Sequence, residues 1–464
     1  MDVSVIILAA GQSTRFHSST PKVLHPLGER PMLAYVVDLA TQLSTTPPVL
    51  VTTPESQDSI RAWCGERVRY ATQTKPYGTG HAVLQAHPLL ENTSAPILVL
   101  YGDTPLLHET TLRQLVQYHV DSQATITLLT VERDASRGFG RIVRDADGRV
   151  KAIVEEVEAT ASVGAVPGIA AIRELNTGIC VFDADALWTL LAQVQPSPVV
   201  GELYLTDCVA LAAQARMTIA TLPVADPTEA LGINTRVDLA DAEVALRRRI
   251  NEHWMLAGVT LVDPATTAIG PEVTIGQDTV IQPNTHLRGR TTIGEGCTIG
   301  PNSLIEGCTI GHHCDVLASV LEFAVMEDDS NIGPFSHLRK GARVCRGAHV
   351  GNFGEMKNST LGPNAKMGHF TYLGDAQIGE NVNIGAGTIT CNFDGQRKHP
   401  TVVENDVFIG SNSLLVAPIH IGTGAKTGAG SVVTHDVPPY TVVYGVPARV
   451  RKELAKGNDE QGED

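Results

Sequence analysis

The pattern of hydrophobic and polar residues changes partway along this chain of 464 residues. Up to about residue 230, short apolar runs alternate with segments whose apolar residues recur at helical spacing. The strand candidates are VSVIILAA (3–10), PPVLVTT (47–53) and APILVLYGD (95–103), and the helix candidates are PMLAYVVDLATQL (31–43) and TTLRQLVQYHV (110–120). This alternation predicts an α/β domain with a mostly parallel sheet, whose ligand site lies beyond the C-terminal ends of the strands.

Residues 235–256 have the pattern of a connecting helix. Thr235 and Asp238 have the spacing of a capping box, which marks a helix start. We expect an apolar face formed by Val237, Ala240, Val244 and Ala245 and a solvated face that carries Arg247, Arg248 and Arg249.

After this helix, an aliphatic residue recurs every six residues, with occasional steps of five. The series runs from Ile269, Ile275 and Ile281 to Ile384, and resumes at Ile409, Leu415, Ile421 and Thr427. Such hexapeptide repeats predict a parallel β-helix in which three repeats form one triangular coil and the aliphatic side chains stack inside.

One segment interrupts the repeat between Ile384 and Ile409, at TCNFDGQRKHPT (390–401). A loop expelled from a coil is either a harmless insertion or a wall of a binding groove. Its Asn, Asp, Arg, Lys and His residues favour the groove.

The composition limits the classes of function. Hydrophobic residues make up 43% of the chain and charged residues 18%, as in globular proteins, and the net charge of −15 argues against nucleic acid as a partner. The apolar runs are too short for membrane insertion, and the N-terminal run follows Asp2 without a basic region, so we expect a buried strand and a cytoplasmic location. The eight cysteines lack CxxC spacing, which favours free buried thiols over metal ligands or disulfides.

A loop with phosphate-binding character follows the first predicted strand. In LAAGQSTRF (8–16), Gly11 and the small residues after it can turn backbone amides towards a polyphosphate, and Arg15 adds a cation. In PKVLHPL (21–27), Lys22 can reach a phosphate as a point charge.

These motifs resemble the nucleotidyltransferases that make nucleotide-sugars, whose signature is LxxGxGTRxxxxxPKxLxP. This chain reads LAAGQSTRFHSSTPKVLHPL (8–27), with Ser13 in place of a glycine. Further matches follow in order at QTKPYGTGHA (73–82), YGDTPLL (101–107), FGRIV (139–143), IVEE (153–156), LNTGI (175–179) and GINTR (232–236). The whole set resembles the bacterial family of bifunctional N-acetylglucosamine-1-phosphate uridyltransferase/glucosamine-1-phosphate acetyltransferases.

The resemblance implies an α/β protein with a Rossmann-like nucleotidyltransferase domain, a linker helix and a left-handed parallel β-helix. We expect these at residues 1–232, 233–256 and 257–455, with a disordered tail at 456–464. Two departures from the family lie near the expected first site. The stretch ATASVGAVPGIAAIREL (159–175) is apolar where relatives are polar, and Pro76 stands where some relatives have glutamine.

For the N-terminal domain, the resemblance implies that Asp103 and Asn234 hold Mg²⁺ and that Lys22 and Arg15, the catalytic cations, hold phosphates. It also implies that Gly140, Glu155 and Asn176 grip the sugar. The residues implied to frame the nucleotide are Leu8, Ala9, Ala10, Gly11, Gln73, Gly78, Thr79, Tyr101 and Gly102.

Segments of the β-helix resemble the acetyltransferase half of the same family: PFSHLRKGARV (334–344), VGNFGEMKNS (350–359), MGHFTYLGD (367–375), VNIGAGTITCNFDG (382–395) and GSNSLLVAP (410–418). The resemblance implies that His369 is the general base, and Glu355 is a candidate to orient it. The implied contacts to glucosamine-1-phosphate are Arg339, Lys357, Tyr372, Asn383 and Lys398. The implied contacts to acetyl-CoA are Ala386, Asn392, Phe393, Ser411 and Ala429.

The last repeat departs from the family. In YGVPARVRK (444–452), Gly445 stands where some relatives have an arginine that meets the CoA phosphate. We hypothesise that Arg449 or Arg451 takes over this contact.

The sequence thus predicts two reactions. Acetyl-CoA acetylates glucosamine-1-phosphate, and UTP then reacts with N-acetylglucosamine-1-phosphate to give pyrophosphate and UDP-N-acetylglucosamine, which feeds cell-envelope synthesis in relatives. We expect a homotrimer that binds these small molecules, with neither nucleic acid nor a membrane as a partner. Two alternatives stay open, a pyrophosphorylase with a structural or regulatory β-helix and a non-catalytic assembly protein.

Overall fold

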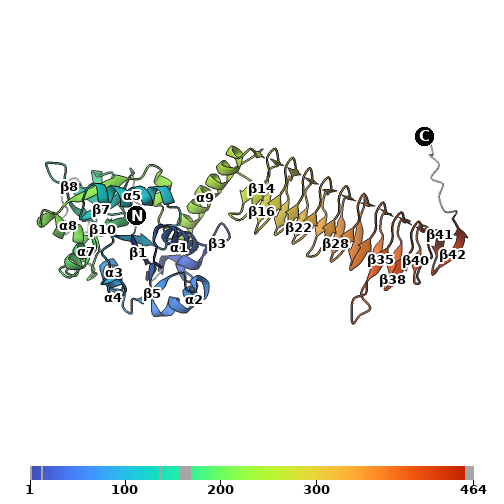
Figure 1. Ribbon diagram of the computed structural model, residues 1–464, viewed down its shortest axis with the longest axis horizontal. Helices are drawn as coiled ribbons and strands as arrows, with labels where there is room; N and C mark the ends of the chain where they lie inside the picture. Colours follow the sequence, from blue (N-terminus) through green and yellow to red (C-terminus); the bar gives the residue numbers. More distant parts are fainter. Residues whose placement is uncertain (1–2, 12–13, 135–137, 157–168, 455–464) are drawn as a thin grey trace. The chain divides into compact units, whose positions relative to one another are not determined.

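The computed structural model describes residues 3–11, 14–134, 138–156 and 169–454. The chain divides into two compact units, Met1–Leu246 and Arg247–Asp464 (Figure 1). Ser13, residues 159–168 of the apolar stretch and the tail 456–464 lie outside the described residues.

The N-terminal unit is built on one twisted sheet with the strand order β11-β7-β10-β6-β1-β4-β5 and a side hairpin, β8–β9. Its strands are β1 (Ser4–Leu8), β4 (Val49–Thr52), β5 (Arg69–Thr72), β6 (Ile97–Tyr101), β7 (Ile126–Glu132), β8 (Arg141–Arg144), β9 (Val150–Val154), β10 (Glu174–Phe182) and β11 (Ile219–Pro223). The three strands expected from the sequence are β1, β4 and β6, and all of their pairings with one another are parallel. Strand β10 runs antiparallel between β6 and β7, so the sheet is mixed at that point.

Helices cover both faces of this sheet. Strands β1, β4 and β6 bury side chains on both faces, which is why they read as continuous apolar runs. The helices are α1 (Met32–Leu43), α2 (Pro54–Cys64), α3 (Thr79–Leu84), α4 (His87–Leu90), α5 (Glu109–Asp121), α7 (Ala184–Leu191) and α8 (Asp207–Gln214). Helices α1 and α5 are the two that the helical spacing predicts.

A buried histidine makes the stability of the N-terminal unit depend on pH. His119 of α5 is 4% exposed, and its Nδ1 lies 2.9 Å from the hydroxyl of Thr127. Burial lowers the pKa of His119, and the negative charge of Asp183 offsets only part of this effect. The unfolded chain therefore takes up this proton first, and stability is lost as the pH falls below about 6.5. We expect His119→Gln to flatten the fall in the unit's melting temperature between about pH 7 and about pH 5, which calorimetry would measure; parallel profiles would contradict this role.

Helix α9 (Arg236–Leu256) confirms the connecting helix and its start. The Asp238 carboxylate accepts from the Thr235 backbone N–H at 2.7 Å, and the Thr235 hydroxyl accepts from the Asp238 N–H at 3.2 Å. The expected apolar face was only partly right. Val237 and Val244 are exposed, whereas Ala242 is buried with Leu239, Ala245 and Leu246 packed beside it, because the face that meets the sheet domain is rotated around the helix.

The C-terminal unit is a parallel β-helix of three sheets, which contain 12, 10 and 9 strands. The twelve-stranded sheet extends from β12 (Thr260–Leu261) to β42 (Ala448–Glu453), the ten-stranded sheet from β13 (Ala268–Ile269) to β40 (Val432–Val433), and the nine-stranded sheet from β14 (Thr274–Ile275) to β38 (Ile419–Ile421). From β12 onward each strand pairs with the strand three places later in the chain, so that Ile275 lies over Ile293 and Ile293 over Ile310, until the last coil, where β39 (Lys426–Thr427) pairs with β41 (Thr441–Gly445). The aliphatic residues of the repeat form one buried column of side chains, as predicted.

The interruption is shorter than the sequence suggested. Thr390 of β34 (Ile389–Cys391) pairs with Leu415 and is 1% exposed, and Val403 of β35 (Thr401–Val403) pairs with Ile378. Both residues occupy inward positions, so the repeat continues through this coil and only Asn392–Pro400 leaves it. The leaving segment projects beside β35 (Figure 1) and is hereafter the 392–400 loop.

Two further features concern the chain as a whole. Within the described ranges, no helix is both long enough and apolar enough to cross a membrane. All eight cysteines carry free thiols, and seven of them are buried.

Two candidate active sites

A cavity of about 890 Å³ opens at the C-terminal ends of strands β1, β4, β5 and β6, where the strand pattern places the ligand site. Twelve of the residues expected to bind the nucleotide, its phosphates or a metal line it: Leu8, Ala9, Ala10, Gly11, Arg15, Lys22, Gln73, Gly78, Thr79, Tyr101, Asp103 and Asn234. Its volume is in the range that takes a small-molecule ligand.

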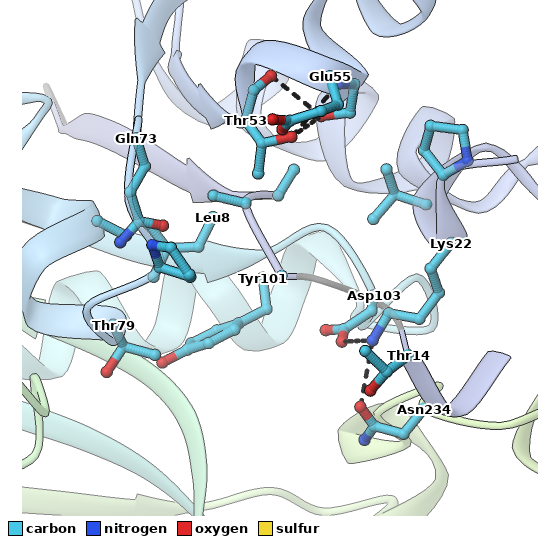
Figure 2. A pocket seen from close by; sticks show the side chains of 18 of the residues that line it. Leu8, Thr14, Lys22, Thr53, Glu55, Gln73, Thr79, Tyr101, Asp103 and Asn234 are labelled. Carbon is cyan, nitrogen blue, oxygen red and sulfur yellow. Dashed lines mark hydrogen bonds and ion pairs between the residues drawn. The ribbon is translucent and has the colours of Figure 1, made fainter. Parts of the chain in front are cut away.

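Four polar side chains converge at one end of this cavity. The Lys22 ammonium donates to Asp103 Oδ2 at 2.5 Å and to Asn234 Oδ1 at 3.2 Å, and Arg15 also donates to Asn234 Oδ1, at 3.1 Å. Figure 2 shows the two oxygens facing the same nitrogen. The Asp238 carboxylate holds Asn234 from behind by accepting its backbone N–H at 3.0 Å.

This arrangement suits a hard divalent cation. The carboxylate of Asp103 and the amide oxygen of Asn234 converge on a point that a positive charge already occupies, the ammonium of Lys22. Among the described residues there is no group of three or more His, Cys, Asp or Glu that could hold a metal. A cation such as Mg²⁺, which keeps waters and binds substrate phosphates, needs only one or two such protein oxygens.

The other end of the cavity is shaped for a planar, hydrogen-bonding group. Gln73 is 4% exposed, and its Nε2 donates to the Gly78 carbonyl and contacts His81 Nδ1, each at 3.0 Å. The bond to the Gly78 carbonyl orients this amide, and its Oε1 can accept a hydrogen bond from a ligand. Figure 2 shows Tyr101 between this end and the Lys22 end, with its hydroxyl towards Thr79. Burial raises the pKa of Tyr101, so its hydroxyl stays protonated.

The residues expected to grip the sugar form a second cluster. The Asn176 backbone donates to the Gly140 carbonyl at 2.8 Å, and Glu155 Oε1 accepts from the Thr206 hydroxyl at 2.7 Å. A side chain at Gly140 would come within 2.8 Å of Ile153 Cγ2 and 3.3 Å of Glu155 Oε2, which explains the glycine. Gly102 packs under the phosphate loop, where its N–H donates to the Leu8 carbonyl.

One wall of the cavity was missed by the sequence analysis. The start of α2 contributes Thr53, Glu55, Ser56 and Ser59 to the lining. Thr53 caps this helix, with its hydroxyl accepting from the Ser56 N–H. The sequence carried a signal for this wall, because Thr53 ends the predicted strand PPVLVTT, Pro54 follows it, and strand ends of a parallel sheet meet at one edge.

In the β-helix, His369 heads a straight file of small residues. Successive coils pair Met367 with Ile384, Ile384 with Ile409, and Ile409 with Thr427. The residues two positions after Met367, Ile384, Ile409 and Thr427 are His369, Ala386, Ser411 and Ala429. In the next coil Val443 pairs with Thr427, and the residue two positions after Val443 is Gly445. At roughly 4.8 Å per coil the file is about 19 Å long. It follows the edge between the twelve- and ten-stranded sheets, hereafter the His369 edge.

Three of the expected sugar-phosphate contacts lie on the ten-stranded sheet. Strand β28 (Gly354–Lys357) points Glu355 and Lys357 outward, and β31 (Thr371–Gly374) points Tyr372 outward beside Glu355. Arg339 lies one coil before Lys357 and donates to Glu355 Oε1 at 2.9 Å. Glu355 therefore pairs with Arg339, and His369 makes no hydrogen bond to any residue that the structure describes.

Positive charge accumulates at the far side of this sheet, hereafter the loop edge. The ammonium of Lys398, on the 392–400 loop, lowers the pKa of Lys357, and Arg339 adds to the effect. Neither lysine forms an ion pair with a carboxylate in the described part of the chain. Two close ammonium groups without an ion-pair partner are the arrangement expected of an anion site.

The remaining expected contacts are distributed over other faces. Asn383 lies on the twelve-stranded sheet, beyond the His369 edge. Asn392 and Phe393 belong to the 392–400 loop, on the opposite side of the ten-stranded sheet from Ala386, Ser411 and Ala429. One chain therefore does not bring all the expected contacts of either ligand onto a single face.

Two arginines lie near the Gly445 end of the file. Strand β42 folds back antiparallel to β41 (Thr441–Gly445). The Arg451 guanidinium lies over the Tyr444 ring, 5.4 Å from its centroid, whereas Arg449 donates to the carbonyl of Ala448 at 2.9 Å. Tyr444 adjoins both Gly445 and Gly428, so Arg451 lies beside the end of the file.

Comparisons with known proteins cover both units. The family model described as nucleotidyl transferase matches residues 4–222, and models described as bacterial transferase hexapeptide (six repeats) and hexapeptide repeat of succinyl-transferase match residues 272–307 and 400–435. A bifunctional protein GlmU from Exiguobacterium sibiricum is 45% identical over 438 residues, which are 94% of this chain and 96% of that one. Its counterparts from Geotalea uraniireducens and Halalkalibacterium halodurans are each 44% identical and cover 97% of this chain, and 98% and 97% of their own lengths.

Proposed function

Because this chain belongs to the family of bifunctional GlmU proteins, we propose that it makes UDP-N-acetylglucosamine in two steps, each in its own unit. Its β-helix transfers the acetyl group of acetyl-CoA to the amine of glucosamine-1-phosphate and releases CoA. Its N-terminal unit then transfers UMP from UTP to N-acetylglucosamine-1-phosphate and releases pyrophosphate. Membership in a family described as bifunctional favours these two activities over a structural β-helix or a non-catalytic assembly protein.

The domain limits follow the chemistry. We assign uridylyl transfer to residues 1–232, the connection to 233–256 and acetyl transfer to the left-handed β-helix at 257–455. The site residues Lys22, Asp103 and Asn234 all lie in the first unit or at its border with α9, and His369 and Lys398 lie in the second.

For uridylyl transfer, the sugar phosphate oxygen attacks the α-phosphate of UTP in line with the leaving pyrophosphate. The chain has to align the two substrates and offset the charge that develops on the phosphate oxygens. Lys22 and Arg15 converge on one end of the cavity and serve this purpose. Asp103 and Asn234 would hold a divalent cation, which we take to be Mg²⁺ and which neutralises phosphate charge when bound.

The base end of the cavity favours uracil. With its Nε2 bound to the Gly78 carbonyl, Gln73 can accept through Oε1 from the N3–H that uracil has and that cytosine lacks. Tyr101 and Gly140 border the ribose and sugar region, where Glu155 and Asn176 supply oxygen and amide groups.

For acetyl transfer, the amine nitrogen of the substrate attacks the thioester carbonyl and His369 takes a proton from that amine. The anion site of Arg339, Lys357 and Lys398 lies across the ten-stranded sheet from His369, with Tyr372 between them. A sugar that carries an amine and a phosphate on neighbouring carbons fits between these groups. The file from His369 to Gly445 presents small side chains along which an extended CoA arm can lie.

A homotrimer would complete this second site. The contacts expected for each ligand lie on different faces of one prism. The His369 edge of a single prism is convex and so cannot enclose a ligand by itself. A neighbouring prism would turn the His369 edge into a groove and bring a second chain's loop or Asn383 to it. The substrates proposed for both sites are small molecules, and we expect the enzyme to act in the cytoplasm, where these occur.

The observation that carries this proposal is the meeting of Lys22, Asp103 and Asn234 in a cavity whose other end holds Gln73. The test is an assay of the purified protein with glucosamine-1-phosphate, acetyl-CoA, UTP and Mg²⁺, and with each omitted in turn. We expect free CoA to form without UTP, and pyrophosphate to form from UTP and N-acetylglucosamine-1-phosphate without acetyl-CoA. A product that requires all four components at once would contradict two independent sites.

The end of the CoA groove gives a more specific prediction. Arg451 is held over Tyr444 at the end of the file, whereas Arg449 is engaged with its own strand. We expect Arg451→Ala to raise the KM for acetyl-CoA by roughly tenfold, as the loss of one charged contact of about 1.4 kcal/mol would, and Arg449→Ala to change it less. Steady-state kinetics with acetyl-CoA and with a CoA thioester that lacks the terminal phosphate would show whether the effect is specific to that phosphate.

A further inference from the structure

The 392–400 loop is tied at both of its ends to a single residue, Asp375. Where the loop leaves the coil, the Asn392 side chain donates from Nδ2 to Asp375 Oδ2 at 2.6 Å. Where it returns, the Thr401 backbone N–H donates to the Asp375 carbonyl at 3.1 Å. Neither the sequence motifs nor the family resemblance gave Asp375 a role.

Asp375 is itself fixed to the coil before it. Its backbone N–H donates to the Lys357 carbonyl at 3.1 Å, and its Oδ1 accepts from Asn358 Nδ2 at 2.6 Å. Gly374 makes room for the tie: a side chain there would come within 2.4 Å of the Tyr372 hydroxyl and 2.7 Å of Asn392 Nδ2. Asp375 thus connects the coil that carries Lys357 to the loop that carries Lys398.

The loop has its own internal order, and beside Asp375 the Ile419 backbone N–H of the next coil donates to its Pro400 carbonyl at 3.3 Å. The Asp394 carboxylate accepts from the Gln396 and Arg397 N–H groups at 2.8 Å and lies 2.6 Å from His399 Nε2. These bonds form a compact turn, and Phe393 and Lys398 face each other in an antiparallel bridge. Such a turn keeps its own shape, so its position over the ten-stranded sheet depends on its base.

We propose that Asp375 is a positioning residue for acetyl transfer, which holds the base of the 392–400 loop so that Lys398 stays beside Lys357 at the anion site. This rests on the proposed acetyltransferase function. Two like charges repel, and the pKa of Lys357 is lowered chiefly by Lys398 and raised by Asp375. A carboxylate at the base of the loop opposes that repulsion and holds both cations ready for a phosphate before the substrate arrives.

The variant Asp375→Asn tests this with little change in shape. Asp375 has a φ of +51°, a conformation that asparagine also tolerates, and the backbone bonds to Lys357 and Thr401 remain. We expect the KM for glucosamine-1-phosphate to rise by roughly tenfold, the equivalent of about 1.4 kcal/mol, with a smaller change in kcat, because the anion site binds the phosphate throughout the reaction.

Asp406→Asn is the matched control. Asp406 has a φ of +59°, donates its N–H to the Glu380 carbonyl and accepts from Asn381 Nδ2 at 3.3 Å, so it repeats the same local structure at a different edge of the β-helix. We expect this variant to keep the wild-type KM. If both variants raise the KM equally, Asp375 has only a structural role.

A double variant separates positioning from general destabilisation. If Asp375 acts through Lys398, then Asp375→Asn should raise the KM much less in a Lys398→Ala background than in the wild-type chain. Equal effects in both backgrounds would overturn the proposal. The failure of the proposed function would look different, because the wild-type chain would then release no CoA from acetyl-CoA and glucosamine-1-phosphate.

Discussion

Replacing Asp103 with asparagine is expected to slow uridylyl transfer by roughly 10²–10³-fold, while acetyl transfer by the same preparation stays unchanged. Asp103 is the carboxylate that faces Lys22, and its oxygen and that of Asn234 converge on one point. Asparagine keeps the size of the side chain but removes the negative charge that draws a divalent cation to this point. The measurement is pyrophosphate release from UTP and N-acetylglucosamine-1-phosphate.

A magnesium titration distinguishes a metal ligand from a residue that only orients Lys22. If Asp103 binds the cation, more Mg²⁺ should restore part of the lost rate, because a weaker site is filled by mass action. If Asp103 only orients Lys22, added Mg²⁺ should change nothing. Asp121→Asn, at the exposed end of α5 where Asp121 accepts from Gln117, is the matched control and should behave as wild type. An unchanged rate for Asp103→Asn at limiting Mg²⁺ would contradict the proposed metal site.

The two units differ in how much of their structure the sequence predicts. In the β-helix, inward positions repeat every six residues and each is stacked on the position three repeats later, so one period determines the whole core. This is why Ile275, Ile293 and Ile310 could be aligned before the structure was known. The N-terminal sheet has no such period, and the antiparallel insertion of β10 between β6 and β7 depends on long-range pairing that local pattern does not carry.

Where the pattern failed, a polar residue or a neighbouring element decided the outcome. Thr390 fills an inward position that the aliphatic repeat does not mark, and the interruption therefore looked longer than it is. The buried face of α9 is set by the sheet domain it packs against, which left Val237 and Val244 exposed. Helical spacing alone allows several faces and does not choose among them.

In the candidate sites too, sequence motifs identified some of the residues but not the contacts between coils. Motifs located the phosphate loop, Lys22 and Asp103, which are close in space because strand ends meet at one edge of a parallel sheet. Contacts between coils were not visible in the motifs. Glu355 pairs with Arg339, and Asp375 reaches forward to Asn392 and back to Asn358, because residues 17 or so apart are neighbours in a β-helix.

Replacing His369 with asparagine is expected to lower the kcat of acetyl transfer by roughly 10²–10⁴-fold, with a smaller change in the KM for either substrate. His369 is exposed at the head of the file, with no hydrogen-bond partner among the described residues, so its loss should remove chemistry without disturbing packing. Asparagine keeps a polar side chain of similar reach but has no basic nitrogen at neutral pH.

The controls for this variant use the chain's two-site organisation. Uridylyl transfer with N-acetylglucosamine-1-phosphate supplied should be unaffected, and His286→Asn, an exposed histidine on β16 (His286–Arg288), should leave acetyl transfer unchanged. A fall in kcat/KM that comes wholly from the KM would assign His369 to binding. An acetyl-transfer rate equal to that of wild type would mean that the amine loses its proton to another group, and His349, the histidine whose pKa is lowered by burial and by the nearby charges of Lys366 and His369, would then be the next to replace.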